Sequence, residues 1–191
     1  MRKGKIFIIS GPSGSGKTTL HKMLLASKKL TGNLVKSVSV TTRSKREGEI
    51  DGCDYFFLTQ KQFLLKVKKD QFLEWQKVFD NYYGTPKDYV HKLLRKGKKV
   101  LLCIDVKGAA VVRHKEPHTI AIFIKVPSFF VLKERLLSRG SDSPESIKVR
   151  LSTARKEMLE AKKYDYVVIN DDLKTALKEL ESIVTRELFF S

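Results

Sequence analysis

Cysteine is scarce in this sequence, with only Cys53 and Cys103 among 191 residues. Two cysteines without a C-x-x-C pair indicate neither a disulfide framework nor a zinc site. His114 and His118 have the spacing of a metal-binding pair on a helix, but Pro117 lies between them and disrupts such a helix. We therefore expect no metal site built from cysteine or histidine.

Long hydrophobic runs are also missing. No apolar stretch approaches the roughly 20 residues of a membrane-spanning helix. The apolar segment behind the first three residues is too short for a signal peptide. With 41% hydrophobic and 31% charged residues, the composition is typical of a globular protein, and we expect a cytoplasmic one without a membrane partner.

Acidic residues are few beside basic ones, with 21 Asp and Glu against 38 Lys and Arg and a net charge of +17. Such a charge attracts nucleotides, and it would also attract nucleic acid. The lysines are scattered, and no zinc-finger or RNP-type signature accompanies them. We expect a basic surface that attracts small anionic substrates, with no nucleic-acid partner.

The clearest motif is a phosphate-binding loop, Gly11-Pro12-Ser13-Gly14-Ser15-Gly16-Lys17-Thr18. It follows an apolar run of strand character and precedes apolar residues at helical spacing, as this motif requires. Glycines let the main-chain N–H groups turn toward a phosphate, and the N-terminus of the following helix adds partial positive charge. Lys17 can reach the terminal phosphates and the Thr18 hydroxyl can contact Mg²⁺. The loop predicts binding of a nucleoside triphosphate.

Strand-like runs alternate with segments of helical pattern along most of the chain. The runs are Lys5–Ser10, Lys99–Asp105, Thr119–Val126 and Tyr164–Asn170, and the helical segments are Lys17–Ser27, Val106–His114, Ser128–Ser138 and Asp172–Phe190. The alternation predicts an α/β fold with a parallel sheet and helices on both faces. The phosphate-binding loop and Asp105 both stand at carboxyl ends of strands, where such sheets bind ligands.

Two stretches interrupt the alternation. Residues 37–86 combine short β-like pieces with one helix candidate at Gln60–Lys69, which predicts an inserted α+β lobe. Residues 140–150 are rich in Gly and Ser and suggest a mobile lid, with a helix restarting at Ser143-Pro144. We expect one domain over residues 1–191, with its core at 1–36, 87–139 and 151–191.

Several further motifs follow the loop in order. They are SVSVTTRSKREGE at 37–49, GCDY at 52–55, FLEW at 72–75, NYYGT at 81–85, IDVKG at 104–108, RLLSRG at 135–140 and VINDD at 168–172. In this order and spacing they resemble the guanylate kinase family over nearly the whole chain. The resemblance implies a P-loop NTPase-type core with a monophosphate-binding lobe and a lid. It also implies ATP-dependent phosphorylation of GMP, with dGMP as a second acceptor and Mg²⁺ as cofactor.

Arg43 and Arg46 follow a Ser/Thr-rich run and present two permanent cations three residues apart. Arginine binds phosphate bidentately, and the hydroxyls of Tyr55 and Tyr83 can complete such an anion site. By resemblance, these four side chains hold the phosphate of GMP. The alternative is that the arginines are surface charges and the tyrosines belong to the core.

Glu74 lies between apolar neighbours, so its carboxylate is expected beside apolar surface. One carboxylate can accept from both N1–H and N2–H₂ of guanine, whereas adenine would leave it unpaired. In the family, Ser39 and Thr85 complete the recognition of the base. The alternative is a solvent-facing Glu74 on a strand.

Arginines also flank the predicted lid. The resemblance implies that Arg135, Arg139 and Arg150 bring positive charge to the transferring phosphoryl group as the lid closes. It further adds Thr19 to the ATP-binding residues of the loop and places Asn170 near the adenine. The expected catalytic residues are Lys17, Arg43, Arg135, Arg139 and Arg150.

One position departs from the family pattern. Where the family has an acid-x-Asp pair, this chain has Cys103-Ile104-Asp105. Cys103 removes one negative charge near the bound phosphates, or simply packs as a small apolar residue. Asp105 is the remaining candidate for an acid near GMP or the metal.

Other functions remain open at this point. The chain could be a P-loop kinase for another nucleoside monophosphate or a ribosyl bisphosphate, although Glu74, Ser39 and Thr85 suit guanine. It could be a guanylate-kinase-like scaffold module that binds phosphorylated peptides, although such modules typically lack a working phosphate-binding loop. A nucleic-acid-binding ATPase is suggested by charge alone. The oligomeric state is not predicted.

Overall fold

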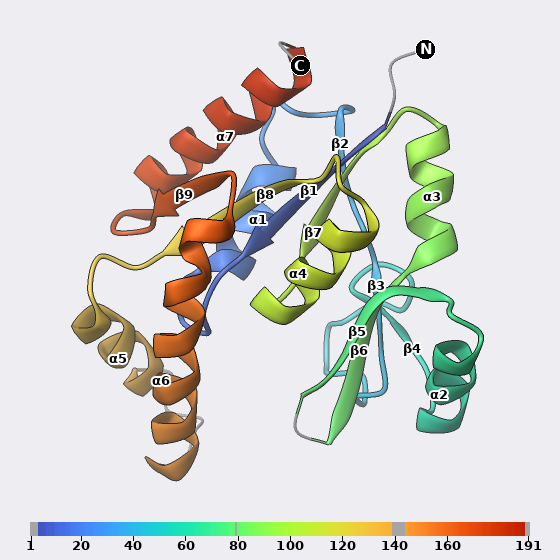
Figure 1. The fold of residues 1–191 in the computed structure, drawn as a ribbon, viewed down its shortest axis with the longest axis horizontal. Helices are drawn as coiled ribbons and strands as arrows, with labels where there is room; N and C mark the ends of the chain where they lie inside the picture. Colours follow the sequence, from blue (N-terminus) through green and yellow to red (C-terminus); the bar gives the residue numbers. More distant parts are fainter. Residues whose placement is uncertain (1–3, 79, 139–143, 190–191) are drawn as a thin grey trace.

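The computed structural model describes residues 4–78, 80–138 and 144–189, and its core is a five-stranded sheet (Figure 1). The strands have the order β2-β7-β1-β8-β9, and every neighbouring pair is parallel. Their bounds are Lys5–Ser10 (β1), Leu34–Lys36 (β2), Lys99–Cys103 (β7), Ile120–Lys125 (β8) and Tyr166–Ile169 (β9). The predicted parallel α/β sheet is confirmed.

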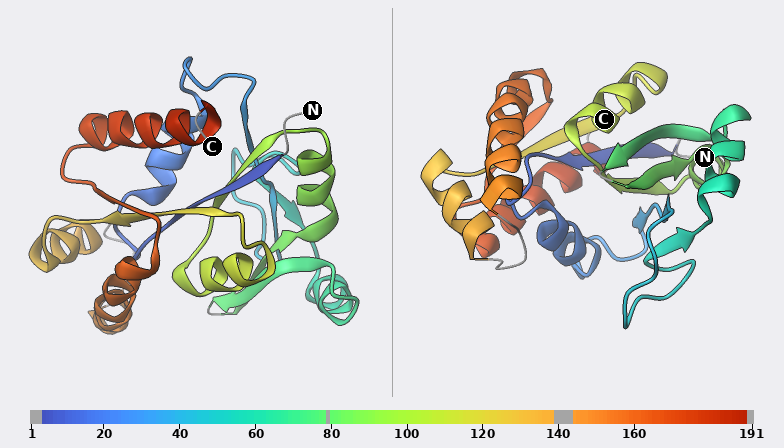
Figure 2. Two further views of the ribbon diagram at one scale, coloured as in Figure 1. Left: turned by 45° about the horizontal axis from the view of Figure 1, so that its top comes forward. Right: turned by 90° about the horizontal axis from the view of Figure 1, so that it is seen from below.

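Helices cover both faces of this sheet, as predicted (Figure 2). Alternate residues of β1 point to opposite faces, so Phe7 and Ile9 pack with α1 (Lys17–Leu25) and α7 (Leu173–Phe189). Ile6 and Ile8 pack on the other face with α3 (Lys87–Arg95) and α4 (Val106–Lys115). Burial on both sides explains why the strand is apolar without interruption.

The lobe has a second sheet and a core of its own. Its strands have the order β4-β3-β6-β5, with β3 and β4 parallel and the other pairs antiparallel. Phe63 of α2 is fully buried and stacks on Phe72 and Tyr82, with ring centroids 4.6 and 5.4 Å away. The bounds are Ser39–Thr41 (β3), Tyr55–Phe57 (β4), Gln60–Lys68 (α2), Phe72–Val78 (β5) and Asn81–Pro86 (β6).

A helical pair, α5 (Phe129–Leu137) and α6 (Pro144–Leu159), lies across the core from the lobe (Figure 1). Leu132, Leu136 and Ala154 form its buried contact, and the 3-10 helix η1 (Glu160–Lys163) follows α6. Residues 140–143 of the predicted lid lie outside the described residues. The remainder of that lid, Pro144–Arg150, forms the first turns of α6, which continues through the boundary predicted at residue 150.

Some element boundaries differ from those predicted. Strand β7 ends at Cys103 rather than Asp105, because the Asp105 carboxylate caps α4 by accepting the Gly108 N–H at 2.6 Å. The short strand β2 and helix α3 were not predicted, although α3 is strongly amphipathic. Among the helices in the described part of the chain, none has the length and apolar character to cross a bilayer.

The aromatic core of the lobe provides a stability prediction. Phe63→Ala should lower the free energy of unfolding by about 3–5 kcal/mol, because it leaves a cavity between two stacked rings. Leu65→Ala on the same helix is the control, since Leu65 is 53% exposed and should change that energy by less than about 0.5 kcal/mol. Urea unfolding measures both values, and equal losses in the two variants would contradict the assignment of this core.

Candidate active site

The phosphate-binding loop joins β1 to α1 in the conformation that its glycines permit. Gly11, Gly14 and Gly16 have φ values of 147°, 88° and 84°. Helix α1 starts at Lys17, so its positive end faces the loop. Lys17 Nζ donates to the Pro12 carbonyl at 3.2 Å, and the Thr18 side chain is exposed at the loop's end.

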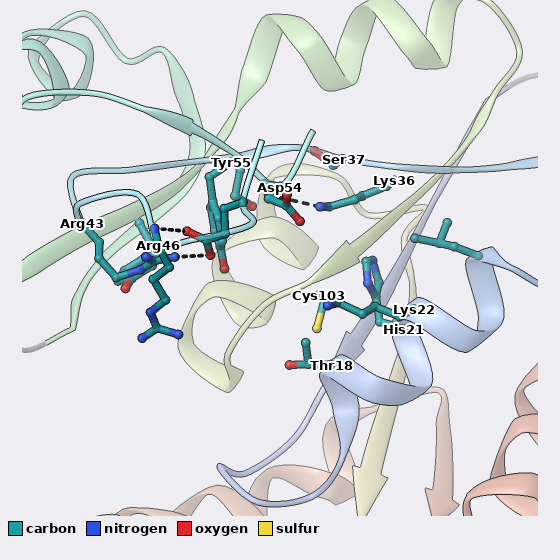
Figure 3. Close-up of a pocket in the computed structure, with 14 residues that line it drawn as sticks. Thr18, His21, Lys22, Lys36, Ser37, Arg43, Arg46, Asp54, Tyr55 and Cys103 are labelled. Atoms are coloured by element: carbon teal, nitrogen blue, oxygen red, sulfur yellow. Dashed lines mark hydrogen bonds and ion pairs between the residues drawn. The ribbon is translucent and has the colours of Figure 1, made fainter. Parts of the chain in front are cut away.

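A cavity of about 390 Å³ lies between the core and the lobe (Figure 3). On the core side it is lined by α1, β2 and the end of β7, and on the lobe side by β3, β4, β6 and the loop between β3 and β4. Figure 3 shows Thr18 and Cys103 facing this space from one side and the arginine-bearing loop facing it from the other. The predicted residues that line it are Thr18, Ser39, Arg43, Arg46, Tyr55 and Tyr83.

Arg43 and Tyr83 meet at the lobe side of the cavity, together with Tyr55. The rings of the two tyrosines pack edge to face with centroids 6.1 Å apart, and the Arg43 guanidinium lies 5.6 Å from the centroid of the Tyr55 ring. Burial raises the pKa of the Tyr55 hydroxyl, which therefore remains a proton donor at neutral pH. The structure thus brings together the groups predicted to bind a phosphate.

Glu49 is a residue of this cluster to which the sequence analysis assigned no role. Its Oε1 accepts from Arg43 Nη2 at 2.7 Å, and its Oε2 accepts from the Arg46 main-chain N–H at 2.8 Å. The hydrogen bond from Arg43 is the main reason that the pKa of Glu49 falls to about 2. The regular spacing of Arg43, Arg46 and Glu49 was the signal that could have identified it.

Glu74 is buried rather than solvent-facing, with 6% of its surface exposed. Its Oε1 accepts from the Thr85 hydroxyl at 2.5 Å across the β5–β6 pair. Burial raises the pKa of Glu74 to about 7, with a smaller contribution from the charge of Asp105, while the Thr85 hydrogen bond opposes the shift. The carboxyl group is thus held by Thr85 and is poised to change charge near neutral pH.

Asp105 and Glu74 approach each other at the N-terminus of α4. A Cβ atom placed on Gly108 would lie 2.8 Å from Glu74 Oε2 and 3.2 Å from Asp105 Oδ1, so a larger residue there would displace the Glu74 carboxyl group. Asp105 belongs to the core and Glu74 to the lobe. The predicted base-reading residues Glu74 and Thr85, which are buried, therefore lie beside the predicted acid Asp105, which is partly exposed.

The predicted catalytic arginines differ in their surroundings. Arg150 of α6 donates to the Ser13 hydroxyl of the loop at 3.3 Å, so α6 reaches the phosphate-binding loop. Arg135 of α5 donates to the Asp171 carbonyl at 3.2 Å. Arg139 lies outside the described residues.

Glu157 lies two helical turns beyond Arg150 on the same face of α6. Its pKa is raised by burial, and the charge of Lys17 opposes that shift. A carboxylate from α6 therefore belongs to the electrostatic surroundings of the loop lysine. The sequence analysis missed it because nothing in the local pattern of α6 separates Glu157 from a solvent-exposed glutamate.

Two further polar residues that line the cavity, His21 and Lys36, were also missed by the sequence analysis. His21 is 5% exposed, and burial followed by the charge of Lys36 lowers its pKa to about 4, so its ring is neutral. Lys36 Nζ donates to the carbonyls of Cys53 and Asp54 at 2.8 and 3.1 Å and so joins the core to the lobe. Burial raises the pKa of the Cys103 thiol, which keeps it neutral.

Comparisons with known proteins agree with this geometry. The family model described as "Guanylate kinase" matches residues 3–187. A guanylate kinase of Rickettsia felis is 46% identical over 97% of this chain and 95% of its own length, and one of Carboxydothermus hydrogenoformans is 45% identical over 98% and 90%. The crystal structure of guanylate kinase from Anaplasma phagocytophilum superimposes with a TM-score of 0.79 and 32% sequence identity. The superposition covers 100% of this chain and 89% of that protein.

These matches extend over almost the whole chain, including the loop, the lobe and the α5–α6 pair. The resemblance inferred from the motifs is therefore confirmed. The chain belongs to the guanylate kinase family, the ATP-dependent enzymes that convert GMP to GDP.

Proposed function

We propose that this chain transfers the terminal phosphoryl group of ATP in line to the phosphate of GMP within the cavity between core and lobe. The observation that carries the proposal is that Thr18 of the phosphate-binding loop and the Arg43–Tyr83 cluster line the same cavity. One cavity with an anion site on each side suits two phosphate groups that must meet. The attacking phosphate oxygen is already ionised, so no strong general base is required.

Lys17 and the arginines neutralise charge in this proposal. Lys17 starts α1 and would turn from the Pro12 carbonyl to the terminal phosphates of ATP. Arg150 already contacts Ser13 in the loop and would support the charge that develops on the transferring group. We propose that Arg135 and Arg139 assist from α5 and the segment that follows it.

In this proposal, Arg43 and Arg46 hold the acceptor phosphate. Arg43 is bound by Glu49 in the structure described here, and this ion pair holds the guanidinium against the tyrosines before substrate enters. Arg43 Nη1 and Nη2 already donate to the Ser44 carbonyl and to Glu49, so a phosphate with two negative charges would bind the remaining N–H groups of this oriented guanidinium. Tyr55 and Tyr83 would complete its coordination through their hydroxyls.

The residues at the loop fit a magnesium ion held mainly by nucleotide phosphates. Thr18 offers an exposed hydroxyl oxygen, the type of ligand that Mg²⁺ prefers. Among the described residues, no group of three or more His, Cys, Asp or Glu side chains could hold a metal ion by itself. When bound, Mg²⁺ supplies neutralisation of the phosphate oxygens, and we propose Thr18 as its protein ligand.

We further propose that Glu74, Thr85 and Ser39 select guanine. The buried Glu74 carboxylate would accept from N1–H and N2–H₂, and the Thr85 hydroxyl holds it in place. None of these contacts involves the ribose, so we propose dGMP as a second acceptor. A cytoplasmic location stays a prediction from the sequence.

The activity test offers the purified protein ATP and Mg²⁺ with GMP, dGMP, AMP, CMP or UMP separately. We expect turnover of GMP and dGMP at about 1–100 s⁻¹ and little with the others. Lys17→Ala should lower kcat by at least about 10²-fold, because it removes a donor aimed at developing charge. No turnover of any monophosphate despite ATP binding would contradict the proposal and favour a phosphopeptide-binding module.

Base selectivity tests Glu74 directly. Glu74→Gln should remove most of the preference for GMP over AMP, which polar mismatches of this kind set at about 10⁴-fold. The kcat/KM ratio for the two nucleotides measures the effect. Glu179→Gln, at an exposed glutamate of α7, is the matched control and should leave the ratio unchanged. Unchanged discrimination in Glu74→Gln would refute the role.

The pKa of Glu74, about 7, predicts a pH dependence of GMP binding. Only the ionised carboxyl accepts both guanine N–H groups, so KM for GMP should fall as the pH rises from 6 to 8. At pH values below the pKa, KM for GMP should change by nearly tenfold per pH unit. Glu74→Gln corrects for titration of the GMP phosphate itself, and its profile should lack this component. Identical profiles for the two proteins would contradict the prediction.

A further inference from the structure

Asn170 lies between β9 and α7 with its side chain turned inward. It is 1% exposed, and its Nδ2 donates to the main-chain carbonyl of Ser15 at 2.7 Å. Its own N–H donates to the Lys125 carbonyl at 2.7 Å, which ties the residue to β8. The amide therefore contacts the phosphate-binding loop, and its place near the adenine stays a prediction.

The neighbouring Gly16 is shaped around this contact. Gly16 has a φ of 84°, and a Cβ atom there would lie 2.3 Å from Asn170 Nδ2. Glycine adopts this conformation without strain and leaves the space that the amide occupies. Because Gly16 also caps α1 directly before Lys17, the Asn170 amide supports the turn that aims the loop lysine.

The direction of the Ser15 carbonyl determines the direction of the next N–H group. A trans peptide is planar, with its C=O and N–H pointing to opposite sides. With the Ser15 carbonyl held toward Asn170, the Gly16 N–H points to the opposite side, away from Asn170. Such N–H groups bind the phosphates of a nucleotide in loops of this type.

The orientation of the Asn170 amide leaves its oxygen unpaired within the described part of the chain, which is energetically unfavourable. Asn170 Oδ1 is buried and has no hydrogen-bond partner among the described residues. An apolar side chain of similar size would avoid this unpaired oxygen. The donor to Ser15 is the feature that distinguishes asparagine from such a residue at this position.

We propose that Asn170 is a positioning residue of the phosphate-binding loop, which fixes the Ser15–Gly16 peptide and thereby sets the affinity for ATP. The role is exerted through the loop and needs no contact between the amide and the adenine. It rests on the proposed binding of ATP at this loop.

Two variants separate the hydrogen bond from simple space filling. Asn170→Asp keeps the shape but places oxygen against oxygen, and Asn170→Ala removes the whole amide. Both should raise the Kd for ATP by about 10- to 100-fold, the range for an unpaired buried partner, with Asp at least as harmful as Ala. Calorimetric titration with ATP alone and with GMP alone measures the two affinities.

The Kd for GMP should stay at its wild-type value, because the lobe supplies the predicted GMP-binding cluster. Asn33→Asp, the same change at an exposed asparagine before β2, should leave both affinities unaltered. The proposal would be overturned if Asn170→Asp bound ATP with wild-type affinity, or if it lost less ATP affinity than Asn170→Ala. An equal loss of ATP and GMP affinity in the variants, together with a lowered Tm, would also overturn it. Failure of the wild-type protein to bind ATP would instead contradict the proposed function.

Discussion

The attachment of the phosphate-binding loop to its neighbours is the constraint on which the site depends. Asn170 holds the Ser15 carbonyl, Arg150 reaches the Ser13 hydroxyl, and Leu132 of α5 packs within contact distance of Gly14. These contacts come from elements far apart in sequence that the parallel sheet brings to one edge. A loop fixed in this way presents its N–H groups without ordering them when the nucleotide binds.

Charged side chains surround the site on the lobe side and on the core side. The lobe presents Arg43 already paired with Glu49, so the cation is oriented rather than free to rotate. At the opposite side, Cys103 is neutral where the family pattern has an acid, and Glu157 of α6 provides a carboxylate in the surroundings of Lys17. The balance of charge therefore involves the helix α6 as well as the strand ends.

Much of the fold could be predicted because its signals are local. The apolar run of β1, the loop glycines and the helical spacing after Lys17 each lie within a short window. Strand β2 has only three residues, which is too short for a periodic pattern, and it was missed. The strand predicted to reach Asp105 ended early because a capping hydrogen bond competes with sheet pairing there.

The sequence by itself determined the kind of chemistry, through a phosphate-binding loop, two arginines and a glutamate among apolar residues. Only the tertiary structure decided which partners these side chains have. Glu74 meets Thr85 through strand pairing, and Asn170 meets Ser15 across 155 positions in sequence. Partners as far apart as Asn170 and Ser15 leave no local pattern, because packing of the sheet and its helices alone sets their distance and burial.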